Sequence, residues 1–206
     1  MLKLILNIAI LVIFAKISLF SQMDKDKLFE NIKTKYSNLN SLSLNFVLNE
    51  NSAIKGELIA KKGNKYVLSV SGRKIYCDGE TIWNYVPENK NVLISNFESH
   101  GETASIERIL FEFTNNFVPL KLYKNQTTYG KSVHTLELVP GSEQQDDITM
   151  IKLDMNTDTH DIYQISIIRN YAEESWRISN LKINPKIADN QFNFVPKDDV
   201  ELIDLR

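Results

Sequence analysis

Cysteine and histidine, which supply most disulfides, metal sites and nucleophiles, are scarce in this 206-residue chain. Cys77 is the only cysteine, so the chain can form no internal disulfide. The histidines, His100, His134 and His160, lie far apart and lack the spacing of a metal site. We therefore interpret Cys77 as a small buried hydrophobic residue and expect neither a metal nor a cofactor.

Sequence motifs that indicate an enzyme are also missing. The chain has no glycine-rich phosphate loop, serine elbow or zinc-type helix motif. Oxygen-bearing side chains between Asp154 and Asp161 invite comparison with a calcium loop, but Thr159 and Ile165 stand where an EF-hand needs glycine and glutamate. Since no set of polar groups converges, we expect a protein that is not an enzyme.

The first residues have the features of a signal peptide. Lys3 precedes an apolar run over residues 4–15, and small residues follow it, so we expect cleavage after Ser21. Residues 1–21 would then be removed, and residues 22–206 would form a single mature domain. An uncleaved anchor helix is disfavoured because Lys16 interrupts the apolar run.

The charge of the expected mature chain restricts its partners. Cleavage would remove Lys3 and Lys16 from the 24 basic residues and none of the 26 acidic ones, which changes the net charge from -2 to -4. Surfaces that bind nucleic acid or anionic membrane are strongly basic, so we expect neither partner. A bacterial lipoprotein carries its lipid on a cysteine directly after the signal sequence, and none lies near Ser21. We expect an exported protein without a lipid anchor of its own.

Two segments of the mature chain have helical periodicity. Residues 24–40 carry Leu28, Ile32, Tyr36 and Leu39 on one stripe. Residues 104–115 place four apolar side chains on one face, namely Ile106, Ile109, Leu110 and Phe113. Pro119 is expected to close this second helical region.

Most other residues alternate between polar and apolar with a period of two, which predicts half-buried strands. About 10–11 strands are expected between Leu42 and Leu205, and turns such as Asp78-Gly79 join many of them. Consecutive hairpins imply an antiparallel meander, and so many strands are expected to curl. The interior of a wide curled sheet must be filled by helices, close tightly or leave an apolar cavity. Composition does not choose among these three.

A family resemblance favours the cavity. The segment Tyr76-Cys77-Asp78-Gly79-Glu80-Thr81-Ile82-Trp83-Asn84-Tyr85-Val86-Pro87 resembles the S-D-G-x-T-hydrophobic-W-x-Y-x-P segment of the outer-membrane lipoprotein carrier protein (LolA) family. Three other segments resemble the family in the same order: Ser43-Leu44-Asn45-Phe46, the hairpin from Gly56 to Val70, and Phe192-Asn193-Phe194-Val195-Pro196 with the strand that follows it.

The resemblance implies a mainly β (α+β) fold, an unclosed antiparallel β-barrel with a helical lid over an apolar cavity. It implies a periplasmic chaperone that binds the acyl chains of lipoproteins released from the inner membrane and carries them to the outer membrane. The implied partners are acylated lipoproteins, an inner-membrane ATP-driven transporter and an outer-membrane acceptor, and the carrier is expected to be a monomer. Two alternatives remain open, namely a periplasmic sensor of the same fold and a carrier of another lipid or glycolipid.

The resemblance also suggests site residues. We expect one concave strand face and the second helix to bind lipid through Phe46, Leu58, Tyr66, Leu68, Trp83, Tyr85, Ile106, Ile109, Leu110 and Phe113. The family usually has Arg-Pro where this chain has Lys62-Gly63, and that arginine is thought to hold the lid shut through backbone carbonyls. Lys62 is thus the lid-closing candidate, although an ammonium lacks the rigid five-donor fork of arginine.

Overall fold

A computed structural model describes residues 24–49, 54–97, 106–128, 130–142, 148–170 and 172–206. Twelve strands form one sheet in the order β12-β6-β5-β4-β3-β2-β1-β11-β10-β9-β8-β7. The strands are β1 (Ser41–Leu48), β2 (Lys55–Lys61), β3 (Lys65–Val70), β4 (Arg73–Asp78), β5 (Thr81–Val86), β6 (Asn91–Asn96), β7 (Phe117–Thr128), β8 (Lys131–Pro140), β9 (Ile148–Asn156), β10 (Ile162–Arg169), β11 (Ala172–Ile183) and β12 (Glu201–Asp204).

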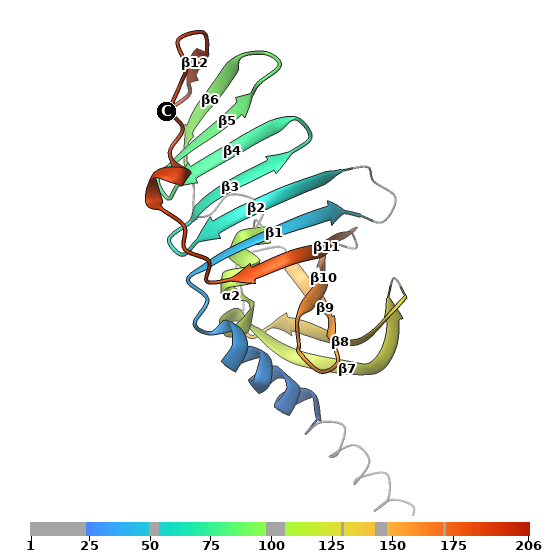
Figure 1. Ribbon diagram of the computed structural model, residues 1–206. Helices are drawn as coiled ribbons and strands as arrows, with labels where there is room; N and C mark the ends of the chain where they lie inside the picture. Colours follow the sequence, from blue (N-terminus) through green and yellow to red (C-terminus); the bar gives the residue numbers. More distant parts are fainter. Residues whose placement is uncertain (1–23, 50–53, 98–105, 129, 143–147, 171) are drawn as a thin grey trace, which may run out of the picture.

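The sheet consists of two antiparallel meanders joined in the middle. Strands β1 to β6 form one and strands β7 to β11 the other, and β1 pairs with β11 between them. In Figure 1, strands β1 to β6 form a twisted, nearly flat part of the sheet, and β7 to β11 curl round below it. Helix α2 (Ile106–Asn116) lies where the sheet curves between these two parts. Strands β7 and β12 are the two edges of the sheet, so it does not close. The predicted unclosed barrel is confirmed.

Both helical predictions are confirmed among the described residues. One helix covers residues 24–36, and we call it the N-terminal helix. Its apolar stripe is buried, as is that of α2, because both helices pack on the concave side of the sheet. The predicted signal peptide, residues 1–21, lies outside the described residues. No described helix combines the length and the apolar content that a membrane span requires.

Three details differ from the sequence-based expectation. The sheet has twelve strands, rather than 10–11, and its last strand, β12, runs parallel to β6 instead of continuing an antiparallel meander. Strand β7 begins at Phe117 and contains Pro119, the residue expected to close the helical region. Proline lacks a backbone N–H, and an edge strand such as β7 can accept it because one side of the strand needs no partner.

The Asp78-Gly79 turn has the predicted form. Gly79 has a φ of +104°, and a Cβ there would lie 2.6 Å from the carbonyl oxygen of Gly63, so only glycine fits. The Asp78 carboxylate accepts hydrogen bonds from the backbone N–H groups of Glu80 and Thr81 at 3.0 and 2.8 Å. This turn therefore fixes the register of β4 with β5.

Candidate functional site

The concave face of the sheet is apolar along its middle strands. In β1, Leu42, Leu44 and Phe46 point to this face and are at most 4% exposed. Their register partners in β2 are Ala60, Leu58 and Gly56. The same register leads on to Tyr66, Leu68 and Val70 in β3, which are half-buried at the border of the core.

Helical side chains fill the concave side next to β1 and β2. Every α2 residue that the sequence indicated for lipid binding belongs to the core cluster, namely Ile106, Ile109, Leu110 and Phe113. The cluster also contains Leu28, Ile32 and Tyr36 of the N-terminal helix. Leu58 and Ala60 are fully buried as a result. An acyl chain could reach this part of the face only if helical side chains moved away.

The apolar face continues beyond the helix-packed strands into β4, β5 and β6. Pairing of β3 with β4 places Ile75 and Cys77 on it, and pairing of β4 with β5 adds Ile82. Leu93 of β6 follows and is 37% exposed. The concave face is therefore mainly apolar from β1 to β6, with Arg73, Asn84 and Asn91 as polar exceptions on the outer strands. It is fully buried at Leu58 and Ala60 and partly open at Leu93.

Two of the predicted lipid-binding residues lie on the opposite side of the sheet. Trp83 pairs with Tyr76, which pairs with Val67. Val67 is next to Leu68 in β3, so its side chain points to the opposite face of the sheet from Leu58 and Leu68. Tyr85 is two residues from Trp83 and shares its side. The expectation that Trp83 and Tyr85 belong to the same face as Phe46, Leu58, Tyr66 and Leu68 is wrong.

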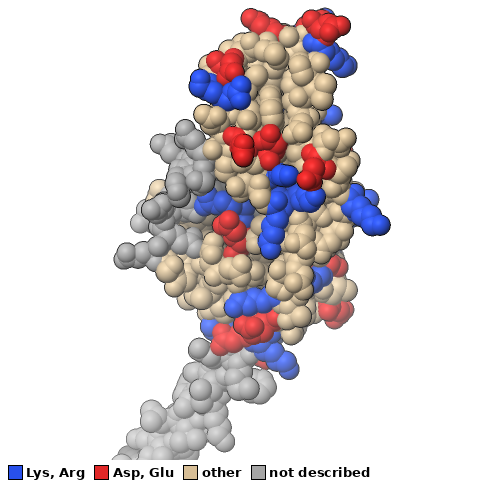
Figure 2. Space-filling model, turned by 90° about the vertical axis from the view of Figure 1, so that its left-hand side faces the viewer, with Lys and Arg blue, Asp and Glu red and all other residues tan. Residues whose placement is uncertain are grey.

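The C-terminal segment covers the side that carries Trp83 and Tyr85. The Phe194 ring packs on Tyr76 and Tyr85, with ring centroids 5.6 and 5.1 Å apart. Phe192, in the 3₁₀ helix η1 (Asp189–Phe192), is fully buried. Figure 2 looks onto the side where this segment lies in Figure 1, and acidic and basic side chains are interspersed over it.

Lys62, the expected lid-closing residue, lies in the turn between β2 and β3. It is exposed, and its backbone N–H donates to the Asn40 carbonyl oxygen at 2.9 Å. Asn40 lies between the turn that ends the N-terminal helix and the first residue of β1. The backbone of Lys62 thus contacts the helix–strand junction, and the lid-closing role of its side chain stays a prediction.

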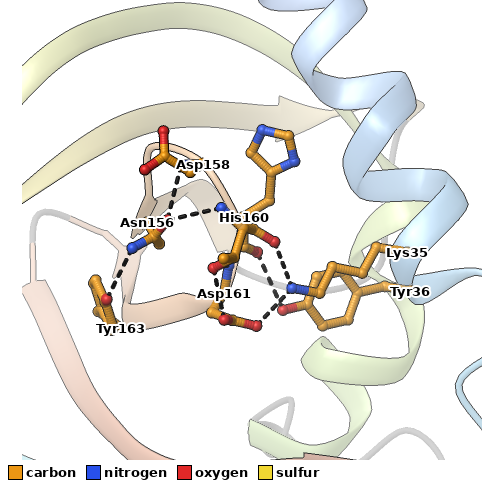
Figure 3. A network of polar contacts seen from close by, with 8 residues as sticks. Lys35, Tyr36, Asn156, Asp158, His160, Asp161 and Tyr163 are labelled. Carbon is orange, nitrogen blue, oxygen red and sulfur yellow. Dashed lines mark hydrogen bonds and ion pairs between the residues drawn. The ribbon is translucent and has the colours of Figure 1, made fainter.

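A polar cluster joins the end of the N-terminal helix to the turn between β9 and β10 (Figure 3). Lys35 Nζ donates to the carbonyl oxygen of Thr159 at 2.7 Å and to the Asp161 carboxylate at 2.6 Å. The Tyr36 hydroxyl donates to the carbonyl oxygen of His160 at 3.4 Å. Asn156 shapes the turn, because its side-chain oxygen accepts the backbone N–H groups of Asp158 and Thr159. We call Lys35, Tyr36, His160 and Asp161 the latch.

The latch changes the titration of two of its members. Hydrogen bonds from Lys35 and Thr159 hold the pKa of the Asp161 carboxyl below its usual value. Burial raises the pKa of the Tyr36 hydroxyl, which stays protonated and able to donate. No local sequence pattern indicates the latch, since its partners are more than 120 residues apart.

The other end of the N-terminal helix is bound to the edge strand β7. Lys25 Nζ donates to the carbonyl oxygen of Pro119 at 2.7 Å, and Lys124 pairs with the Asp24 carboxylate. Contacts at its two ends therefore hold this helix across the curled half of the sheet. Among the described residues, no group of three or more His, Cys, Asp or Glu side chains could hold a metal ion.

Comparison with known proteins supports the fold. The model of the outer membrane lipoprotein carrier protein LolA family matches residues 37–195, which is well over half of the chain. The chain belongs to the LolA family. This family is named for carriers, a description of binding and not of catalysis.

A curated relative found by sequence similarity is distant. An uncharacterised protein of Methanocaldococcus jannaschii is 22% identical over 196 residues, which are 88% of this chain and only 54% of that protein. The chain thus spans about half the length of this curated relative.

Several solved structures resemble the chain. An uncharacterised conserved protein from Thermus thermophilus has a TM-score of 0.53 at 10% identity, over 86% of this chain and 98% of that one. A LolA superfamily protein from Nitrosomonas europaea has a TM-score of 0.42 at 12% identity, over 80% and 97% of the two chains. LprF from Mycobacterium bovis gives 0.48 at 9% identity, over 80% and 95%. The Thermus structure supports the same fold for this chain.

Proposed function

We propose that the chain is a periplasmic carrier that binds the acyl chains of lipoproteins on its concave face. The observation that supports this best is the mainly apolar face that runs from β1 to β6, with Leu58 fully buried by the core and Leu93 partly open to solvent. A sheet that served only as a scaffold would gain stability by covering such a face along its whole length. Membership in a family of lipoprotein carriers suggests what occupies it.

Exchange of helix contacts for lipid contacts explains how binding can be both strong and reversible. The transfer of an acyl chain of ~15 methylenes from an apolar environment into water is unfavourable by roughly 12 kcal/mol, at about 0.8 kcal/mol per methylene. A chain that enters between α2 and the sheet would replace the contacts of Ile109, Leu110 and Phe113. Since these helix contacts are lost on binding, net affinity falls and release to an acceptor becomes possible.

The proposed route follows from the family. The carrier would receive triacylated lipoproteins from an ATP-driven transporter in the inner membrane and deliver them to an acceptor in the outer membrane. The proposed lining is Phe46, Leu58, Tyr66 and Leu68 with the four apolar residues of α2. Trp83 and Tyr85 are left out because the register places them on the other side.

A pair of charge substitutions one residue apart tests the site. Leu68→Glu places a carboxylate on the concave face, and Ser69→Glu places it on the opposite face of the same strand. We expect Leu68→Glu, and Tyr66→Glu likewise, to abolish binding of a fluorescent peptide that bears a hexadecanoyl chain. Ser69→Glu should bind like the wild type, and the peptide without its acyl chain should not bind.

Circular dichroism and thermal unfolding would verify that each variant is folded. If Leu68→Glu and Tyr66→Glu bind the acylated peptide like the wild type, the concave face is not the site. If the wild-type protein fails to bind it, the carrier proposal fails. Mass spectrometry of lipid that copurifies from the native host would then distinguish a lipoprotein from another lipid cargo.

A further inference from the structure

Two buried amide oxygens interrupt the apolar concave face of the outer strands. They are the Oδ1 atoms of Asn84 in β5 and Asn91 in β6. Both atoms are shielded from solvent, and neither accepts a hydrogen bond within the part of the chain that the structure describes. Buried polar atoms in folded proteins almost always have a partner, so two such atoms close together require a physical reason.

Strand register places Asn84 among apolar side chains, whereas Asn91 lies between Val86 of β5 and Glu201 of β12. Asn84 lies between Ile75 of β4 and Leu93 of β6, which are its partners on the two neighbouring strands. Along β5 it is flanked on the same face by Ile82 and Val86. Asn91 is the register partner of Val86, so the two asparagines are diagonal neighbours across β5 and β6. Diagonal neighbours in a sheet are about 7–8 Å apart, within the span of one ligand head.

An apolar residue of similar size would suit this position better in the free protein. Leucine has the same branched shape as asparagine, with methyl groups in place of the amide oxygen and nitrogen, and leaves no acceptor without a partner. Residues that break a local rule in this way are typical of functional sites, where a ligand satisfies what the free protein leaves open. The missing group is a hydrogen-bond donor, because the orphaned atoms are carbonyl oxygens.

We propose that Asn84 and Asn91 form a polar subsite that recognises an amide N–H where an acyl chain joins its head group. This inference rests on the proposed function and narrows its cargo to amide-linked acyl lipids. An ester-linked chain has no donor at that point, and a free fatty acid presents a carboxylate that carbonyl oxygens repel. An amide-linked chain places its N–H one carbonyl group away from the first methylene, where the asparagines interrupt the apolar face.

Two matched ligands test the subsite. N-methyldodecanamide and methyl dodecanoate differ only by an N–H in place of an ester oxygen, and each can displace pyrene, an apolar fluorescent probe, from the full-length mature protein. We expect the wild type to bind the amide about two- to tenfold more tightly, which is the range of one net hydrogen bond. Asn84→Leu should bind both ligands equally, through loss of affinity for the amide alone.

Two further measurements separate recognition from a structural role. Asn84→Leu should unfold at the same temperature as the wild type or a higher one, because it removes a buried atom without a partner. Asn96→Leu, an exposed change on the opposite side of β6, should keep the preference for the amide. A lower unfolding temperature for Asn84→Leu, with equal loss of both ligands, would show a structural amide and overturn the inference.

The remaining outcomes are equally decisive. Equal binding of the amide and the ester by the wild type would reject the subsite and leave the carrier proposal intact. Failure of both ligands to displace pyrene would count against the carrier proposal itself. Dodecanol supplies an O–H donor with the same chain, and tighter binding of dodecanol than of the amide would overturn the assignment to an amide.

Discussion

The ring of Tyr36 meets the ring of Phe113 edge to face, with centroids 5.8 Å apart and an interplanar angle of 62°. The Tyr36 hydroxyl donates at the same time to the carbonyl oxygen of His160 in the β9–β10 turn. One side chain thus joins the N-terminal helix to α2 and to the curled half of the sheet. If acyl chains enter beside α2 as proposed, α2 must move, and Tyr36 then links the closed state of the helices to the stability of the fold.

Substitution of Tyr36 should separate the contribution of its ring from that of its hydroxyl. Tyr36→Ala removes a buried ring and should destabilise the protein by about 3–5 kcal/mol. Tyr36→Phe removes only a hydrogen bond of 3.4 Å and should cost less than about 1.5 kcal/mol. Urea unfolding at neutral pH measures both values. Equal losses for the two variants would mean that the hydroxyl, and not the ring, holds the helices together.

The latch also predicts a dependence of stability on acid. The pKa of Asp161 is lowered in the folded protein, so its ion pair with Lys35 contributes stability above the unfolded value of about 3.9. That contribution is lost as the pH falls through the lower pKa of the folded state. We expect no more than about 1 kcal/mol, because the Asp161 side chain is 53% exposed and salt screens the pair.

Unfolding of wild type and Asp161→Asn as a function of pH tests this prediction. The variant should be less stable than the wild type at pH 7, and the difference should vanish well below pH 4. Asp158→Asn removes a carboxylate from the same turn but keeps the contact between Lys35 and Asp161, so it should behave like the wild type. A difference between wild type and Asp161→Asn that persists in acid would show that the ion pair is not its source.

Local patterns predicted most of the secondary structure, because each pattern depends on neighbouring side chains alone. Alternation from Leu42 to Leu48 predicted β1, and the stripe from Leu28 to Tyr36 predicted the N-terminal helix. The pairing of β1 with β11 joins segments more than 100 residues apart, and no local pattern encodes it. The same is true of the parallel pairing of β12 with β6.

The misplacement of Trp83 and Tyr85 has a specific physical cause. Strand β5 carries apolar side chains on both faces, with Ile82 and Val86 on either side of Asn84 on the concave face and Trp83 and Tyr85 on the other. Alternation sorts its residues into two sets but cannot say which set faces inward when both are covered. The C-terminal segment covers one of these sets, and only the register with β4 reveals which.

The glycine at position 56 should be required by the packing of the concave face. A Cβ there would lie 2.3 Å from Cζ of Phe46 and 2.5 Å from the backbone oxygen of Ser69, which cannot move without disturbing β3. We expect Gly56→Ala to destabilise the protein by about 1–3 kcal/mol through overpacking. Gly141→Ala is the control, because its Cβ would come no closer than 3.4 Å to Val118 and should change stability by no more than about 0.5 kcal/mol. Equal effects in thermal unfolding would show that Phe46 can shift freely.

Loss of the Phe194 ring should lower stability without affecting lipid binding. This ring packs on Tyr76 and Tyr85 on the side of the sheet that faces away from α2. Each aromatic pair contributes about 0.5–1.5 kcal/mol beyond the area that it buries, so Phe194→Ala should be destabilised by more than that amount. Its affinity for the acylated peptide should equal that of the wild type at a temperature where both are folded. Weaker binding by folded Phe194→Ala would contradict this prediction. It would indicate that the face with Trp83 and Tyr85, which the C-terminal segment covers, also contributes to lipid binding.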